Sequence, residues 1–415
     1  MNLLVVCPHF APDTAPTGEV ATAIVEALAD RGHRVHVVTA LPWYRLHDVE
    51  PEWRGARWRT ESTEWGAVTR LHPFPTDKRN IPARALAFGG FTALASAAAI
   101  ATRIRPDVVL AMSPPLPLGV TGWLASVTRG RPFVFNIQDV FPDVAVELGA
   151  ITSRRAIALA SALERWSYRR ADAVTVLSED LRRNVAAKLG GQRPERVRVI
   201  PNFVDTERIV VMDRSTAYRE EHGLGDRLVV MYAGNVGMSQ SLDLVVEAAR
   251  RLRDREDVVF VVNGGGSALE DVVRSAAGLD NVRFVPAQPR ERLPEVLATG
   301  DVHLVPLRRG LARSSVPSKL YSILAAGRPV LASVDEGTEV ARTVRSAGAG
   351  VAVPPEDADA FTAALEQLLD DPAGRAAAGA AGRRFVEGWA SPAAVAEAYE
   401  ALFEEVRRDR WLRRG

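Results

Sequence analysis

One stretch of the sequence combines cationic and hydroxyl side chains in an order that suits an anion. Residues 314–333 read SSVPSKLYSILAAGRPVLAS, and Arg308 and Arg313 precede them. Such side chains can bind a phosphate where a helix begins, because the first N–H groups of a helix lack partners and its dipole favours negative charge. A phosphate seat at this predicted helix start, with Arg and Lys side chains nearby, is therefore one interpretation of the stretch.

The elements around this stretch follow from local pattern. Residues 302–307 form an apolar run of strand length, and residues 318–326 predict a short helix. Pro317 suits the first turn of that helix, and Gly327 suits the left-handed position after its end. An ordinary strand–helix–strand unit with a solvated basic loop explains the same pattern, so both interpretations stay open at this point.

Glycines at two other helix starts offer further phosphate contacts, because a backbone without side chains can approach a ligand closely. The first group follows the apolar run 3–7, and the second follows the predicted strand 228–233. The candidate residues are Gly18, Glu19, Gly234, Asn235, Gly237 and Gln240. Nothing like G-x-G-x-x-G follows the first strand, so a nicotinamide cofactor is not supported. A third run, 264–266, is interpreted as a tight turn between a strand and a helix.

Polar side chains also follow a predicted strand in the first half of the chain. Gln138 and Asp139 come directly after the apolar residues 133–137. Parallel sheets place ligands beyond the carboxyl ends of their strands, so these two are candidates for chemistry. A helix cap is the equally weighted alternative for Asp139.

Composition limits the class of protein. The chain has 415 residues, of which 47% are hydrophobic and 25% charged, which indicates a folded protein of two or three domains. The net charge of +1 argues against nucleic acid as a partner, and the single cysteine, Cys7, cannot form an internal disulfide and favours the interior of the cell. The start has no basic leader, so we expect no signal peptide. No His, Cys, Asp or Glu cluster has convincing metal-ligand spacing, so no metal is expected.

Alternating strands and helices predict an α/β fold with doubly wound parallel sheets. Residues 205–226 are charged and weakly periodic, and we interpret them as a linker between two such domains. The predicted divisions are 1–205, 206–390 and a closing helix within 391–415. That helix has apolar residues at helical spacing and should pack on another element.

Residues 85–101 are uncharged and rich in alanine and glycine. A buried helix explains them better than a transmembrane one, because their transfer energy is weak. With Lys78, Arg79 and Arg84 ahead of it, a helix touching an anionic lipid surface is a third interpretation.

Five segments in order resemble the retaining GT-B glycosyltransferases of the large family-four group, over essentially the whole chain. They are RGHRVHVVT, RRADAVTVLSEDLRRNV, VRVIPNFVD, YAGNVGMSQSLDLVVEAA and LYSILAAGRPVLAS. FNIQDVFPDVAVELGAI and VPSKLYSILAAGRP resemble the bacterial surface-polysaccharide branch, which is often linked to N-acetylated amino sugars. The resemblance implies two Rossmann-like domains facing across a cleft, with the nucleotide-sugar donor on the second and the acceptor mostly on the first. It also implies a last helix that crosses back to the first domain.

Carried over by position, the resemblance gives roles to particular residues. Gly18 matches the loop that approaches the donor diphosphate. Asn235 and Gln240 stand where most relatives have the Arg and Lys that clamp it, and Ser314 and Ser322 stand where the common pattern has two glutamates. The expected donor-binding residues are Gly18, Glu19, Gly234, Asn235, Gly237, Gln240, Arg308, Arg313, Ser314, Pro317, Ser318 and Ser322.

The expected catalytic residues are Lys319, Asp139, which would orient the acceptor hydroxyl, and Gln138, which stands near the family's usual active-site histidine. The function implied is retaining transfer of a sugar, an N-acetylated hexosamine by resemblance, from a UDP-linked donor to a glycan or polyprenyl-linked acceptor, with no cofactor. The protein would lie in the cytoplasm, and at the inner face of the plasma membrane if the 78–101 region touches lipid. A UDP-sugar epimerase or hydrolase on the same scaffold and a non-catalytic nucleotide-sugar-binding subunit are the alternatives.

Overall fold

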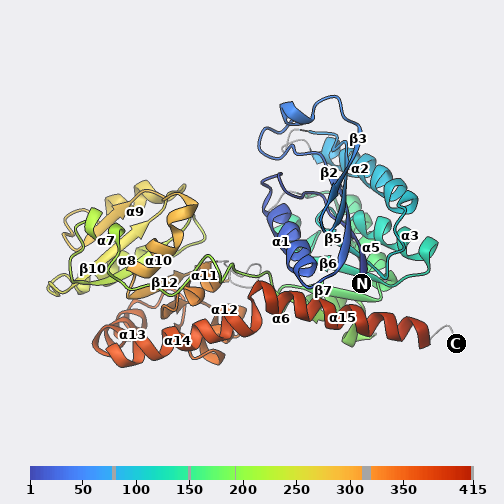
Figure 1. The fold of residues 1–415 in the computed structure, drawn as a ribbon. Coiled ribbons are helices and arrows are strands. Elements are labelled where there is room, and N and C mark those ends of the chain that lie inside the picture. Colours follow the sequence, from blue (N-terminus) through green and yellow to red (C-terminus); the bar gives the residue numbers. More distant parts are fainter. Residues whose placement is uncertain (77–80, 148–150, 192, 311–318, 413–415) are drawn as a thin grey trace. The chain divides into compact units, whose positions relative to one another are not determined.

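The chain forms two compact α/β units in a computed structural model (Figure 1). Unit 1 comprises Met1–Asn202 together with Val395–Gly415, and unit 2 comprises Phe203–Ala394. The structure describes all residues except 77–80, 148–150, 192, 311–318 and 413–415. Each unit contains its own sheet and its own cluster of buried apolar side chains.

Unit 1 is built on an eight-stranded sheet with the strand order β3-β4-β2-β1-β5-β6-β7-β8. The strands are β1 (Asn2–Val6), β2 (Arg34–Ala40), β3 (Trp58–Thr63), β4 (Gly66–Leu71), β5 (Val108–Ser113), β6 (Phe133–Ile137), β7 (Ala173–Val176) and β8 (Val197–Val199). The helices are α1 (Pro16–Asp30), α2 (Ile81–Ala101), α3 (Leu118–Arg129), α4 (Asp143–Glu147), α5 (Arg154–Arg170) and α6 (Glu179–Lys188), with most of α15 (Pro392–Leu412).

Strand β3 is an element of this sheet that its own sequence does not mark. It pairs antiparallel with β4 at the sheet edge, whereas the other neighbouring strands are parallel. Its sequence, WRTEST, is polar, and its residues are exposed or half-buried. An edge strand of this kind lacks the continuous apolar run that marks a strand buried on both faces.

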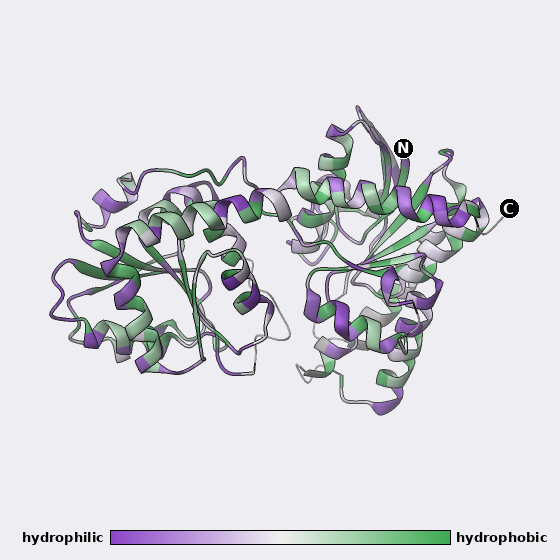
Figure 2. Cartoon of the chain, turned by 90° about the horizontal axis from the view of Figure 1, so that it is seen from below, coloured by the Kyte–Doolittle hydropathy of each residue, from purple (hydrophilic) through white to green (hydrophobic). Residues whose placement is uncertain are grey.

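Unit 2 is built on a six-stranded parallel sheet with the order β11-β10-β9-β12-β13-β14. The strands are β9 (Leu228–Ala233), β10 (Val258–Asn263), β11 (Val282–Val285), β12 (Val302–Pro306), β13 (Val330–Ser333) and β14 (Gly350–Val353). The helices are α7 (Ala217–Glu221), α8 (Leu242–Arg251), α9 (Leu269–Ser275), α10 (Leu293–Thr299), α11 (Lys319–Ala325), α12 (Glu339–Ser346), α13 (Ala358–Asp370) and α14 (Pro372–Trp389). Figure 2 shows most of the strands of both units in the green of hydrophobic residues. The predicted doubly wound α/β fold is confirmed.

The strand order reverses beside the first strand of each unit. In unit 1, β1 pairs with β2 on one side and β5 on the other. In unit 2, β9 pairs with β10 on one side and β12 on the other. The loops leaving the carboxyl ends of these strands diverge at such a point and leave a crevice, which is where open α/β sheets bind ligands.

The segment 205–226, which we interpreted as a linker, is packed firmly on unit 2. Tyr218 of α7 is fully buried, and Arg219 is 6% exposed. The Arg219 guanidinium donates to the Asp301 carboxylate over 3.2 Å and to the carbonyl of Thr299 over 2.8 Å. The charged composition therefore did not distinguish a linker from a packed segment, because the sequence does not show whether an arginine is buried with hydrogen-bond acceptors or exposed.

Helix α15 packs on unit 1 along its apolar face. Val395, Tyr399 and Leu402 are each at most 5% exposed. The Asn136 side chain on β6 donates to the Tyr399 hydroxyl over 2.7 Å. Near the end of the helix, Arg410 donates to the Asp172 carboxylate over 2.8 Å. The predicted packing of this helix on another element is confirmed.

Helix α2, the segment considered above for lipid contact, buries one side against unit 1. Its buried residues include Phe91, Ala95 and Ala99. Among the helices that the structure describes, none combines the length and the apolar character needed to cross a bilayer.

Replacing Tyr399 by phenylalanine tests the contact between α15 and β6. Tyr399→Phe keeps the ring and removes the hydroxyl that accepts from buried Asn136. We expect a loss of about 1 kcal/mol in the free energy of unfolding, measured by urea denaturation of the full chain. The control Trp411→Phe alters a 75% exposed ring and should leave stability unchanged. An unchanged midpoint for Tyr399→Phe would show that this bond contributes nothing.

Candidate functional site

A cavity of about 420 Å³ lies in unit 2 at the carboxyl ends of its sheet. It surrounds the end of β9, where the strand order reverses. Its lining comes from the loops after β9, β10 and β11 and from helices α10 and α11: Ala233, Gly234, Asn235, Asn263, Gly264, Gly265, Ala287, Gln288, Pro289, Arg290, Leu293, Val296, Leu297, Lys319 and Ser322. The lining therefore includes four residues that we selected from the sequence, Gly234, Asn235, Lys319 and Ser322.

Two glycine-containing loops form one wall by packing main chain against main chain. The Gly234 N–H donates to the Asn263 carbonyl over 3.0 Å, and the Val236 N–H donates to the Gly265 carbonyl over 2.8 Å. A Cβ at Gly264 would lie 1.9 Å from the Gly234 carbonyl oxygen, which no side chain can tolerate. The run 264–266 is thus more than a tight turn, because it brings a second loop to the cavity.

The Lys319 ammonium is enclosed in this wall. Its Nζ donates to the Tyr232 hydroxyl over 2.8 Å and lies 3.9 Å from the centre of the Tyr232 ring. The Tyr232 hydroxyl in turn donates to the Asn235 carbonyl over 2.6 Å. Burial lowers the pKa of Lys319 from its ordinary 10.5 to about 8. Among the described residues no carboxylate pairs with it, and its recorded contacts are those with Tyr232. A cation with a lowered pKa beside a cavity is a candidate for ligand binding.

Asn263 is a lining residue that sequence reasoning missed. Its Oδ1 accepts from the hydroxyl of Tyr218 over 2.8 Å, and Tyr218 belongs to the segment interpreted as a linker. Asn263 ends β10, so the rule that selected polar residues after β6 would have found it. Gln288 and Arg290, after β11, were missed because nothing in their local sequence marks them.

Other expected donor-binding residues serve the loop itself. Gln240 accepts from the Gly237 N–H over 2.9 Å, and a Cβ at Gly237 would lie 2.7 Å from the Asn235 side chain. Arg308 donates to the Met238 carbonyl and to the Asp243 carboxylate, both over 3.0 Å. These contacts fix the turn after β9, and none of Gly237, Gln240 and Arg308 is in the cavity lining. Arg313, Ser314, Pro317 and Ser318 lie outside the described residues.

In unit 1, Gln138 and Asp139 lie at the end of β6 and differ in their contacts. Gln138 is buried; its amide donates to Asn136 over 2.7 Å and accepts from Asn202 over 2.8 Å. These bonds join Gln138 to the hydrogen-bond network that also contains Tyr399. The amide of Gln138 therefore stabilises the fold of unit 1. Asp139 is exposed. Its carboxyl group is nevertheless partly shielded from water by neighbouring atoms, and this desolvation raises its pKa. Its carboxylate is the more accessible of the two groups.

Gly18 and Glu19 lie in the first turn of α1. A Cβ at Gly18 would lie 2.8 Å from the Cβ of His9, so this glycine lets α1 begin close to the loop after β1. Glu19 is exposed. Among the described residues no three His, Cys, Asp or Glu side chains come together as metal ligands.

Both halves of the sequence match models of glycosyltransferase domains. Residues 17–202 match the model of the glycosyl transferase 4-like domain, and residues 227–371 match that of the glycosyl transferases group 1. A putative colanic acid biosynthesis glycosyl transferase, WcaI of Escherichia coli K12, is 31% identical over 384 residues, which cover 89% of this chain and 92% of that protein.

Two further proteins are similar to this chain, one in sequence and one in fold. A GDP-mannose-dependent alpha-(1-6)-phosphatidylinositol monomannoside mannosyltransferase of Mycolicibacterium smegmatis is 33% identical over 53% of this chain and 59% of its own length. A solved structure described as trehalose-6-phosphate from E. coli bound with UDP-2-fluoro glucose has a TM-score of 0.69 at 14% identity, covering 97% of this chain and 99% of that one. The two Rossmann-like units therefore form a GT-B fold, and the chain belongs to the glycosyltransferase family that combines a 4-like domain with a group 1 domain.

Proposed function

We propose that this chain transfers a sugar from a nucleotide diphosphate sugar, UDP-linked, to a glycan or lipid-linked acceptor in bacterial polysaccharide or glycoconjugate biosynthesis. The observation that carries the proposal is the half-buried Lys319, whose ammonium donates to Tyr232 beside the cavity and has no carboxylate partner among the described residues. A nucleoside diphosphate has the charge that such a site lacks. The UDP-2-fluoro glucose bound to the structural relative supports the choice of nucleotide.

In the proposed donor site, the backbone of the two glycine-containing loops contacts the phosphates and Lys319 provides the positive charge. Gly234 and Gly265 line the cavity without side chains, so phosphate oxygens can approach their backbone. Lys319 supplies the positive charge that Asn235 and Gln240 no longer carry at the positions of the usual clamp. One buried cation acts more strongly than an exposed one, because the surroundings screen it less.

The proposed reaction breaks the bond between the anomeric carbon and the diphosphate, and the diphosphate leaves with the electron pair. Lys319 stabilises the negative charge that grows on the leaving oxygens. The acceptor hydroxyl attacks the anomeric carbon from the same face, and a leaving phosphate oxygen takes its proton. Configuration is then retained without a covalent carboxylate. Asp139 orients the acceptor hydroxyl, which is a task of positioning. We propose an N-acetylated hexosamine as the sugar by resemblance alone.

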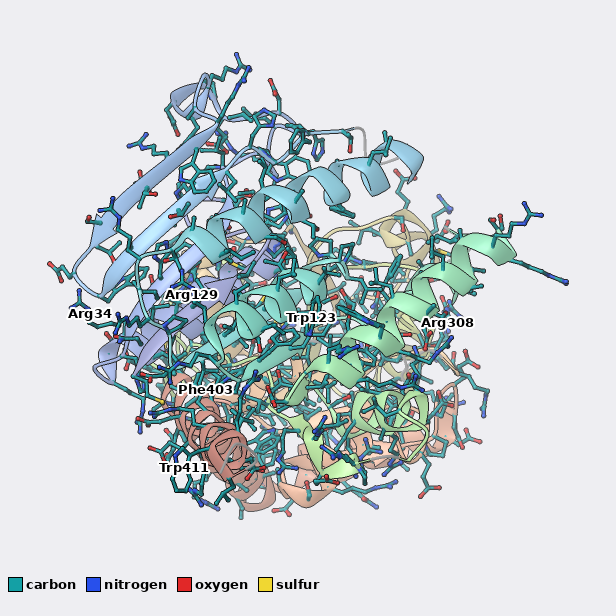
Figure 3. The ribbon with its side chains drawn as sticks, turned by 90° about the vertical axis from the view of Figure 1, so that its right-hand side faces the viewer. Arg34, Trp123, Arg129, Arg308, Phe403 and Trp411 are labelled. Atoms are coloured by element: carbon teal, nitrogen blue, oxygen red, sulfur yellow. The ribbon has the colours of Figure 1, made fainter. Side chains whose placement is uncertain are left out.

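A lipid-linked acceptor would lie at a membrane, and one face of unit 1 suits an anionic bilayer. Helices α2, α3 and α5 cover that face (Figure 3). Together they contain a single acidic residue, Glu164, which is buried and paired with Lys188 over 2.7 Å. Leu86 and Leu159 are 79% and 74% exposed. The exposed arginines on and beside α2, α3 and α5 are Arg103, Arg105, Arg131, Arg154, Arg155, Arg165, Arg169 and Arg170. We propose that this face, which includes the described part of the 78–101 region, contacts anionic lipid at the inner face of the plasma membrane.

The function is tested with a panel of UDP-, GDP- and dTDP-sugars, by thermal stabilisation and by release of free nucleotide. We expect a UDP-sugar to raise the melting temperature more than UDP alone. Gly265→Leu should abolish the shift, because a Cβ at Gly265 meets no atom within 4 Å and the residue lines the cavity. Gly388→Leu, at an equally open but distant position on α14, is the matched control. No shift with any nucleotide would refute the proposal, and product release without an acceptor would favour the epimerase or hydrolase.

Lys319→Met should stabilise the protein and weaken its affinity for UDP. Since the folded state lowers the pKa of Lys319 to about 8, the protonated side chain costs stability below that pH. The gain from Lys319→Met is on the order of 2 kcal/mol at pH 7, and it disappears as pH rises from about 8 to 10.5. For the same reason, UDP affinity of the unaltered protein should fall above pH 8. Urea denaturation measures the change in the free energy of unfolding, and calorimetry measures the change in UDP affinity.

Lys188→Met is the matched control for this variant. Lys188 pairs with Asp143 and Glu164, both over 2.7 Å, so its loss should lower stability and leave UDP affinity unchanged. If Lys319→Met bound UDP as tightly as the unaltered protein, the ammonium would have no part in the donor site.

Binding to vesicles tests the membrane face. We expect the full chain to sediment with phosphatidylglycerol-containing vesicles and to stay in solution with pure phosphatidylcholine. In the test variant, glutamine replaces four arginines of α5: Arg154, Arg155, Arg165 and Arg169. Each charge near an anionic surface contributes about 1 kcal/mol, so this variant should lose nearly all binding. In the control variant, glutamine replaces four exposed arginines of unit 2: Arg253, Arg274, Arg345 and Arg384. Equal binding by both variants would refute a contact through this face.

A further inference from the structure

The loop after β1 holds a histidine in a fixed orientation at the point where the strand order of unit 1 reverses. The Nδ1 of His9 lies 2.6 Å from an oxygen of Asp13. Asp13 is 3% exposed, and its other carboxylate oxygen accepts from the Tyr44 N–H over 3.2 Å. The imidazole is therefore oriented by a carboxylate that is itself anchored to the loop after β2.

This contact decides which ring nitrogen carries the proton. An ionised carboxylate can only accept hydrogen bonds, so Nδ1 must donate to Asp13. The Nε2 of the neutral ring then holds a free lone pair. Among the described residues nothing bonds to Nε2, and the His9 side chain remains 13% exposed. The structure thus presents one oriented acceptor atom to solvent.

An aromatic wall stands beside this acceptor. The rings of His9 and Trp43 are stacked, with centroids 5.7 Å apart and planes 26° apart. Tyr44 meets His9 edge-on with centroids 5.5 Å apart. Trp43 is half-buried and packs against the core of unit 1, so its position is fixed. Aromatic faces beside polar atoms suit a ligand that has both hydroxyl groups and apolar C–H faces, as sugars do.

Gly18 shows that the arrangement is built into the start of α1. Any larger residue there would press on the Cβ of His9 and on the carbonyl of Asp13, at 2.8 Å and 3.3 Å. Gly18 thereby keeps the His9–Asp13 pair close to α1. This is a role in unit 1 that differs from the donor contact expected by resemblance.

We propose that His9 and Trp43 form a sugar-binding subsite, in which Nε2 of His9 accepts a hydrogen bond from a hydroxyl of the acceptor. The proposal rests on the proposed function for the identity of the ligand as the acceptor. His9 follows β1 and Asp139 follows β6, and only β5 lies between these strands. His9 and Asp139 therefore follow strands two positions apart, at the same edge of the sheet.

The test observes the His9 ring directly in the full chain with ¹⁵N-labelled histidine. The probes are the methyl β-glycosides of glucose, galactose and N-acetylglucosamine at about 50 mM, enough to detect millimolar affinity. The His9 signals are identified by their loss in His9→Phe. We expect the Nδ1–H tautomer and a glycoside-dependent shift of Nε2. We also expect Asp13→Asn, whose amide can donate to Nδ1, to reverse the tautomer and weaken glycoside binding about tenfold.

Controls separate this inference from the proposed function. His47→Gln, an exposed histidine 6.5 Å from the Tyr44 ring, should leave the shift unchanged. If no glycoside moved the His9 signal, or if UDP alone moved it as strongly, the subsite would be overturned. If glycosides moved it while no nucleotide sugar bound, the sugar subsite would stand and the transferase proposal would fail.

Discussion

The cavity of unit 2 depends on the direct packing of two backbone loops. The loops after β9 and β10 exchange hydrogen bonds between Gly234 and Asn263 and between Val236 and Gly265. Gly264 has to be glycine, since a Cβ would overlap the Gly234 carbonyl, and its φ of +156° is rare for other residues. Because no side chains separate the loops, backbone is left at the cavity surface. The enclosed Lys319 then supplies the charge that this backbone lacks.

The position of Lys319 in this wall lowers the stability of the folded protein. An ammonium buried without a carboxylate is destabilising, and the lowered pKa of Lys319 reflects that penalty. The contact with Tyr232 reduces it only in part, because a phenol is a neutral partner. A bound diphosphate would supply the missing negative charge. Under the proposed function, the instability caused by this ammonium and its affinity for a diphosphate would have the same physical origin.

The sequence predicted most of the fold because buried parallel strands are continuous apolar runs. Strands β6 and β9 begin and end at the expected residues, 133–137 and 228–233. Strand β3 was missed because polar edge strands lack that run, and the role of α7 was missed because Arg219 looks like a surface charge. For the site, rules about strand ends found Gly234 and Asn235.

The residues missed at the candidate sites differ in how far local sequence marks them. Asn263 ends β10 and could have been found by that position, although the contact that orients it comes from Tyr218, 45 residues before it. His9 and Asp13 are near neighbours in the sequence, and yet their significance comes from Trp43 and Tyr44, which the sheet brings beside them by pairing β1 with β2. A lone histidine after a strand is usually unremarkable. What distinguishes His9 is that one nitrogen is fixed by a buried carboxylate and the other is left without a partner among the described residues, at the crevice where a doubly wound sheet binds ligands.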